Sequence, residues 1–257
     1  FVMIGALIFL GCPLRMILRL GGGDLNALFG IAGFAGGIGF GTIFLKRGYS
    51  LQRTYALSKL ESAMMPAIQV GLLVLVVTAP AFIFFSQKGP GAMHAPWLIS
   101  LAAGIVVGGL SQFSRLCTVG GFRDLFLFKK SILIFGYLAV LVGVFLVNIS
   151  FGNFHLGFEN QPIAHTDGLW NFLGMALAGF CSVLLGGCPL RQLIMTGEGN
   201  SDSAVTVLGL AAGAAFAHNF GLAASGAGPT LNGEIAVVVG FIVALIIAVV
   251  NTKRANA

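Results

Sequence analysis

Long apolar runs separated by short polar segments alternate along the whole chain, and each run is continuous rather than alternating at every second residue. Continuous apolar runs of this kind predict membrane-spanning helices and argue against the strands of a transmembrane barrel. The predicted spans are residues 25–45, 64–85, 97–113, 131–149, 169–187, 203–220 and 234–250. Residues 1–10 form a shorter run that is too short to span a bilayer, so we expect N-terminal sequence to be missing.

The composition supports the same class of protein. Hydrophobic residues make up 57% of the 257 residues and charged residues 9%, whereas a soluble domain has about 25% charged residues. The net charge of +6 comes from small basic groups beside apolar runs, as in membrane topology signals, so it does not indicate nucleic-acid binding. The fold class predicted from the sequence is an all-α polytopic membrane protein, with residues 1–257 as a single transmembrane domain.

One pentapeptide, Gly-Cys-Pro-Leu-Arg, occurs at residues 11–15 and again at residues 187–191, an offset of 176 (188 − 12). The same offset pairs further glycines without a gap: Gly21 with Gly197, Gly23 with Gly199, Gly33 with Gly209 and Gly37 with Gly213. We interpret residues 1–48 and 177–224 as two copies of one structural unit. Glycine and proline interrupt a helix, so backbone breaks are expected at Gly11, Pro13, Gly187 and Pro189.

The positive-inside rule predicts opposite directions for the two copies. The loops 46–61 and 114–130 and the C-terminal tail are basic and are expected in the cytoplasm. The loops 150–168 and 221–233 have no Lys or Arg and are expected outside. We therefore predict inverted repeats whose broken or re-entrant helices meet at the bilayer midplane, as in many transporters.

The two breaks carry the first candidate site residues, Cys12 with Arg15 and Cys188 with Arg191. A thiol is a weak donor with a polarizable sulfur, so it can contact a soft solute without holding it tightly. An arginine near a break could balance the charge of an anion. The alternatives are that the cysteines are small packing residues and that the arginines are interfacial anchors.

A third candidate segment contains Arg115-x-Cys117 and, further on, Arg123-Asp124. Cys117 could lie at a cytoplasmic exit, or could simply pack in the core. Arg123 and Asp124 could form an ion pair that orders this segment. Cys181 lies on an apolar run, where we expect packing rather than function.

The remaining features have structural interpretations. Glycine clusters within the spans predict close helix packing. Asp24 and either Ser201 or Asp202 are candidate N-caps, and the helix N-termini at 24 and 200–203 could offer donor amides to an anion. His94, His155 and His165 fall in predicted external loops without metal-ligand spacing, so we expect them to be solvated. We find no nucleotide-binding loop, zinc-ligand set or catalytic triad, and predict no enzymatic activity, cofactor or metal.

Two groups of motifs resemble the YeeE/YedE family of bacterial inner-membrane proteins. They are Gly186-Gly187-Cys188 with Thr196-Gly197-Glu198-Gly199, and Arg115-x-Cys117 leading to Gly121-Phe122-Arg123-Asp124. The family includes thiosulfate uptake proteins and others linked to selenium, and the second pattern is most similar to the YedE branch. The resemblance implies an hourglass-shaped fold with short helices at its waist, and cysteines along the path at Cys12, Cys117 and Cys188.

The resulting hypothesis is a multi-pass inner-membrane transporter or channel-like uptake protein for a small sulfur or selenium anion such as thiosulfate or selenite. Its route would use Cys12, Cys117 and Cys188, with charge balanced by Arg15, Arg191, Arg115 and Arg123. A TusA-like sulfur-carrier protein in the cytoplasm is the partner that the resemblance implies. Two alternatives stay open: a membrane enzyme that transfers sulfur or selenium through Cys117, and a membrane-assembly partner without a solute path.

Overall fold

The computed structural model describes residues 1–51, 59–79 and 94–255, together with the single residues 82, 84, 87 and 92. The helices in chain order are α1 (Val2–Phe9), α2 (Pro13–Gly21), α3 (Asn26–Lys46), α4 (Lys59–Thr78), α5 (Trp97–Phe113), α6 (Thr118–Phe128), α7 (Ile132–Ser150), α8 (Gly168–Leu184), α9 (Pro189–Gly197), α10 (Ser201–Asn219) and α11 (Leu231–Ala255). Within the described residues, 6 helical stretches are long and apolar enough to cross a membrane. The prediction of an all-α polytopic membrane protein is confirmed. Residues 52–58 of the predicted loop 46–61 lie outside the described part of the chain.

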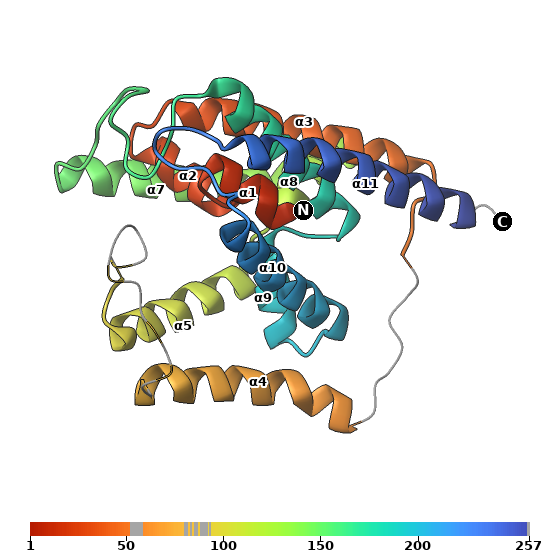
Figure 1. The fold of residues 1–257 in the computed structure, drawn as a ribbon, viewed down its shortest axis with the longest axis horizontal. Coiled ribbons are helices and arrows are strands. Elements are labelled where there is room, and N and C mark those ends of the chain that lie inside the picture. Colours follow the sequence, from red (N-terminus) through yellow and green to blue (C-terminus); the bar gives the residue numbers. More distant parts are fainter. Residues whose placement is uncertain are drawn as a thin grey trace.

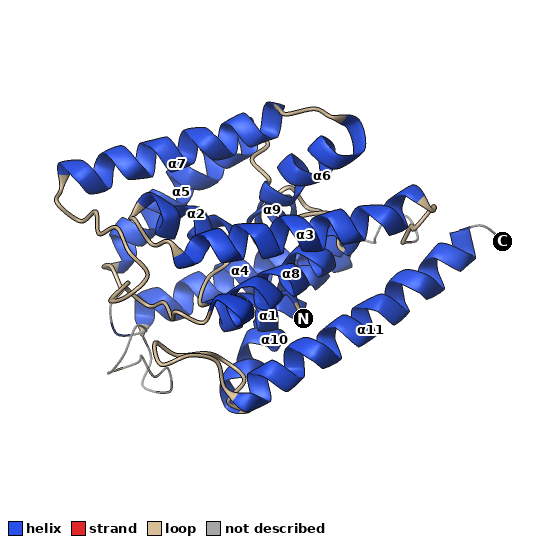
Figure 2. Cartoon of the chain, turned by 90° about the horizontal axis from the view of Figure 1, so that it is seen from above, coloured by secondary structure: helices blue, strands red, loops and turns tan. Residues whose placement is uncertain are grey.

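Helices α3 and α8 lie side by side at the centre, with α7 along one side and α11 along the other (Figure 2). Figure 1 shows α4 and α5 on the side of the molecule where α9 and α10 lie. Glycines allow α3 and α8 to pack closely. A Cβ atom added to Gly33 would lie only 2.0 Å from the Phe172 carbonyl oxygen, and one added to Gly37 would lie 2.0 Å from the Ala176 carbonyl oxygen. Both distances are too short for any side chain, so only glycine fits at these two positions. The expectation that the glycine clusters serve helix packing is confirmed at these positions.

Three long helical stretches are broken, each at a cysteine. The break between α1 and α2 is at Cys12, that between α8 and α9 is at Cys188, and that between α5 and α6 is at Cys117. The third break corrects the expectation of a loop at 114–130. Although this segment is polar enough to resemble a loop, its residues 118–121 are small or apolar and are buried, so they begin helix α6.

At the first two breaks, a side chain of the helix after the break bonds a carbonyl at the end of the helix before it. The Arg19 guanidinium donates to the Phe9 carbonyl oxygen, and Gln192 Nε2 donates to that of Leu185 at 3.1 Å. The last carbonyls of a helix have no intrahelical partner, so these bonds satisfy groups that the break would otherwise leave unpaired. Arg19 also forms a buried ion pair with Asp24, with 2.6 Å between Nε and Oδ2.

The segment 151–167 packs over the end of α2. The backbone N–H of His155 donates to the Gly22 carbonyl and that of Gly157 to the Gly23 carbonyl. The expectation that His165 is solvated is wrong, because this side chain is only 2% exposed. Its Nε2 donates to the Ile8 carbonyl at 2.7 Å and its Nδ1 accepts from the Asp167 N–H at 3.2 Å. Burial lowers the pKa of His165, and both bonds fit the neutral imidazole.

Candidate functional site

Cys12, Cys117 and Cys188 all occupy the N-cap position of a short helix, those of α2, α6 and α9 respectively. Cys12 (φ −74°, ψ 170°) and Cys188 (φ −72°, ψ 164°) have nearly the same extended backbone. Proline explains this likeness, because it excludes the helical conformation from the residue before it and favours the first helical position. Cys117 precedes Thr118 instead, and its sulfur accepts the Gly120 backbone N–H at 3.3 Å.

The helix N-termini beside the cysteines are therefore those of α2, α6 and α9, whereas the sequence pointed to the starts of α3 and α10. The N-cap of α3 is Leu25 rather than Asp24, although an Asp24 carboxylate oxygen does accept the Asn26 backbone N–H. The N-cap of α10 is Asn200 rather than Ser201 or Asp202. The unpaired N–H groups and positive dipole end of each short helix adjoin a thiol.

The three cysteine-capped N-termini come together around one tyrosine. The Cys117 and Cys188 side chains lie close together in one buried cluster. Tyr137, in the second turn of α7, packs in the same buried cluster and also lies near Cys12. Cys188 is 2% exposed and Cys117 9%, so the site is closed to solvent at this point. Cys12 is partly exposed.

The glycine before each Cys-Pro pair makes room for the arginine that follows it. A Cβ on Gly11 would stand 2.9 Å from Arg15 Cδ, and one on Gly187 would stand 3.4 Å from Arg191 Cβ. Each arginine stem therefore lies back over its glycine, within the same turn as the cysteine. This contact explains why glycine and arginine flank both cysteines at the same spacing.

The two arginines differ in their partners. Arg191 forms an ion pair with Glu198 at 3.6 Å and donates to Gln112 Oε1 at 3.1 Å. Arg15 Nε is buried and has no hydrogen-bond partner among the described residues. The positive charge of Arg15 is therefore not neutralised by a contacting carboxylate in the described structure, whereas that of Arg191 is shared with Glu198.

The other two predicted arginines lie on either side of Cys117. Arg115 is exposed and adopts a left-handed backbone conformation, with φ 52°. Arg123 forms an ion pair with Asp124 at 2.9 Å, as the sequence predicted. Among the described residues, neither Arg115 nor Arg123 is shown in contact with a thiol. Arg15 and Arg191, which lie within one turn of Cys12 and Cys188, are therefore the better candidates for balancing the charge of an anion.

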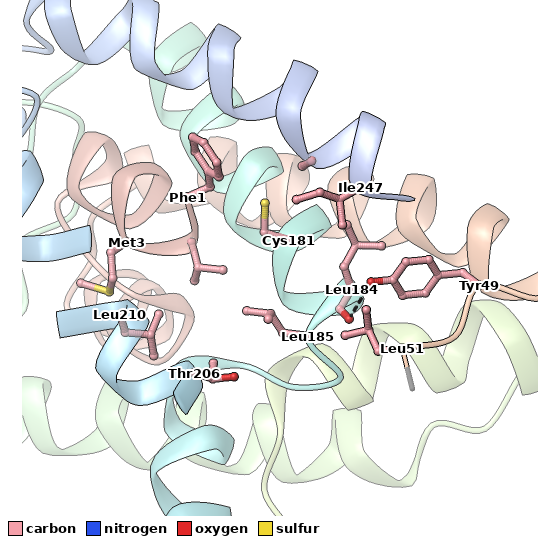
Figure 3. A pocket seen from close by; sticks show the side chains of 13 residues that line it. Phe1, Met3, Tyr49, Leu51, Cys181, Leu184, Leu185, Thr206, Leu210 and Ile247 are labelled. Carbon is pink, nitrogen blue, oxygen red and sulfur yellow. Dashed lines mark hydrogen bonds between the residues drawn. The ribbon is translucent and has the colours of Figure 1, made fainter. Parts of the chain in front are cut away.

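A separate apolar cavity of about 290 Å³ lies between α1, α8, α10 and α11 (Figure 3). Cys181 lines it, and on its far side the Tyr49 hydroxyl donates to the Leu184 carbonyl at 3.3 Å. Its lining includes none of the residues predicted to form the route. Cys181 is buried on the cavity wall, away from the three N-capping cysteines.

Sequence reasoning missed two residues of the site, Tyr137 and Thr118. Tyr137 is one of 3 tyrosines in the chain and stands within an otherwise apolar span, which was the available signal. Thr118 directly follows Cys117 in the segment 114–130, for which the sequence predicts a loop. The buried pair Arg19 and Asp24 was also missed, because it depends on how α2 turns back toward α1.

The family model for sulphur transport matches residues 113–256, which include Cys117, Tyr137 and Cys188. No curated protein and no solved structure matches the chain. The matched region covers more than half of the chain, and the family is one of transporters. The chain therefore belongs to the sulphur transport family, YeeE/YedE, whose membership implies sulphur transport across a membrane.

Proposed function

We propose that this chain carries a small sulfur or selenium anion, with thiosulfate and selenite as examples, inward across the bacterial inner membrane. The observation that supports the route most strongly is the meeting of three cysteine-capped helix N-termini around Tyr137. Helix N-termini favour anions, and thiol sulfur is soft enough to contact sulfur or selenium weakly.

In this proposal Arg15 attracts the anion, and Cys12, Cys188 and Cys117 make successive weak contacts with it. Arg191 balances charge when its bond to Glu198 opens. Because Cys188 and Cys117 are buried, passage requires α2, α6 and α9 to move apart by a small amount. The sequence has no ATPase motif, so an electrochemical gradient or consumption in the cytoplasm would drive the flux.

The orientation follows from the basic segments. Residues 46–61, 114–130 and the C-terminus would be cytoplasmic, so that units 1–48 and 177–224 form inverted copies. The helix bounds agree with such copies, because α2 (Pro13–Gly21) and α9 (Pro189–Gly197) differ by the same offset at both ends. A TusA-like carrier protein would receive the sulfur in the cytoplasm, and a selenium substrate would suit the YedE branch.

Uptake by proteoliposomes tests the route. We expect Cys12→Ala, Cys117→Ala and Cys188→Ala each to reduce uptake of labelled thiosulfate strongly, while Cys181→Ala, the matched buried control, retains it. Competition with selenite and sulfate ranks the substrates. Normal uptake by all three route variants would reject the proposal. A persulfide on Cys117 in the intact mass, with uptake absent, would favour the transfer enzyme instead.

A further inference from the structure

Two buried hydroxyl groups at the cysteine site have no hydrogen-bond partner among the residues that the structure describes. They are Tyr137 Oη and Thr118 Oγ1, in side chains that are 7% and 2% exposed. Buried polar groups are nearly always hydrogen-bonded, and leaving one unpaired costs about 1–3 kcal/mol. Two such groups in the same cluster are available to bind a partner that is not among the described residues.

The packing of α6 against α7 brings these hydroxyls to the thiols. Glycines 120 and 121 of α6 meet Leu133 and Ile134 of α7, where an added Cβ would stand 3.1 and 3.2 Å from their side chains. Tyr137 lies one turn further along the same face of α7, because residues three and four positions apart share a helix face. Its ring packs edge-on against Phe122 of α6, with 5.9 Å between the ring centroids.

Thr118 approaches the same point from the first position of α6. Its hydroxyl and its backbone N–H both lie near the Cys188 sulfur, as does the backbone N–H of Arg191. The residue after Cys12 and Cys188 is proline, which has no N–H to offer. The Cys117 break is the one of these three at which the first helical residue can present both an amide and a hydroxyl.

We propose that Tyr137 Oη and Thr118 Oγ1 donate hydrogen bonds to the oxygen atoms of the transported anion while Cys117 and Cys188 contact its soft atom. The inference rests on the proposed function and adds two specificity-determining residues to it. Hydroxyl groups are stronger donors than thiols, so the oxygen end of a mixed anion binds them in preference. An anion with oxygen and sulfur engages both sets of groups, whereas hydrosulfide engages the thiols alone.

The test is the concentration dependence of labelled thiosulfate uptake in proteoliposomes. Tyr137→Phe and Thr118→Val remove one hydroxyl each and keep the shape of the side chain. We expect each to raise KM about tenfold or more, the range that a hydrogen bond to a charged group supplies. Inhibition of uptake by hydrosulfide should be unchanged in both variants, which a general packing defect would not produce.

Two buried hydroxyls with protein partners provide the controls. The Tyr49 hydroxyl donates to the Leu184 carbonyl, and Thr196 Oγ1 donates to that of Gln192 at 2.8 Å. Tyr49→Phe and Thr196→Val should keep the KM of the unmodified protein. A normal KM in Tyr137→Phe and Thr118→Val, with uptake still lost in Cys188→Ala, would overturn this inference and leave the proposed function intact. An equal rise of KM in the control variants would also overturn it.

Discussion

The Cys117 and Cys188 side chains lie close together in one buried cluster although they begin different helices, α6 and α9. Each thiol is fixed by its helix, and the two helices approach from different parts of the chain. The contact therefore brings together two positively polarised helix ends as well as two sulfur atoms. Both cysteines lie within the region that matches the sulphur transport family.

A pair of buried thiols should bind a soft metal ion. We expect cadmium to raise the unfolding temperature of the detergent-purified protein, since thiolates prefer soft metals. At about 100 times its Kd, a ligand that binds the folded state alone stabilises it by about 2.7 kcal/mol. The shift should disappear in Cys117→Ala and in Cys188→Ala but persist in Cys181→Ala. A full shift in both single variants would show that the two sulfurs are not the ligands.

Arg15 should matter more for uptake than Arg191, because Arg191 is already paired with Glu198 and Gln112. We expect Arg15→Gln to raise the KM for thiosulfate about tenfold or more, as for the loss of a bond to a charged group. Arg191→Gln should have a smaller effect. Lys46→Gln, at the exposed end of α3, controls for net charge. A larger effect in Arg191→Gln than in Arg15→Gln would contradict this ranking.

The contact between α3 and α8 should tolerate alanine at one glycine and not at its neighbour. Gly37→Ala would place a Cβ 2.0 Å from the Ala176 carbonyl oxygen, and overpacking of a core costs about 1–3 kcal/mol. Gly36→Ala meets only the Phe172 ring at 3.9 Å and should be neutral or stabilising by up to about 1 kcal/mol through helix propensity. Thermal unfolding in detergent compares them, and equal melting of the two variants would refute the close contact.

Stability should fall in mildly acidic solution because of His165. Burial lowers its pKa in the folded protein, so below about pH 6.5, the usual value, the unfolded chain binds a proton that the folded chain does not. Stability then decreases as the pH falls from about 6.5 toward the lowered pKa of the folded state. His165→Gln, whose amide can still donate to the Ile8 carbonyl, should reduce this slope in unfolding experiments. His155→Gln, at an exposed side chain, should leave it unchanged.

The sequence predicted those parts of the fold that depend on local chemistry. The breaks at Cys12 and Cys188 follow from glycine and proline, and the bounds of α2 and α9 begin at those prolines. Most of the membrane spans follow from continuous apolar runs. The inverted orientation of the two copies and the roles of the cysteines and arginines stay predictions.

Other features depend on contacts between distant segments and could not be read from local patterns. Helix α6 begins at residues 118–121, which are buried, and Gly120 and Gly121 pack against α7. This burial depends on a distant helix, so the local sequence offers no reason to expect it. From the sequence, Tyr137 in an apolar span is typical of a core residue. Only the fold shows that Cys12 and Cys188 lie near it. His165 is buried against the Ile8 carbonyl, which is 157 residues away in the sequence, so the local pattern around His165 could not predict this contact.

The buried ion pair of Arg19 and Asp24 has a consequence for natural variation. Loss of either partner leaves an uncompensated charge, which costs about 3–5 kcal/mol, whereas replacing both by uncharged residues can be nearly neutral. The two residues should therefore be inherited together or lost together. By the 176-residue offset, the positions that correspond to them hold Met195 and Asn200, both uncharged, so this one chain already carries the two permitted combinations.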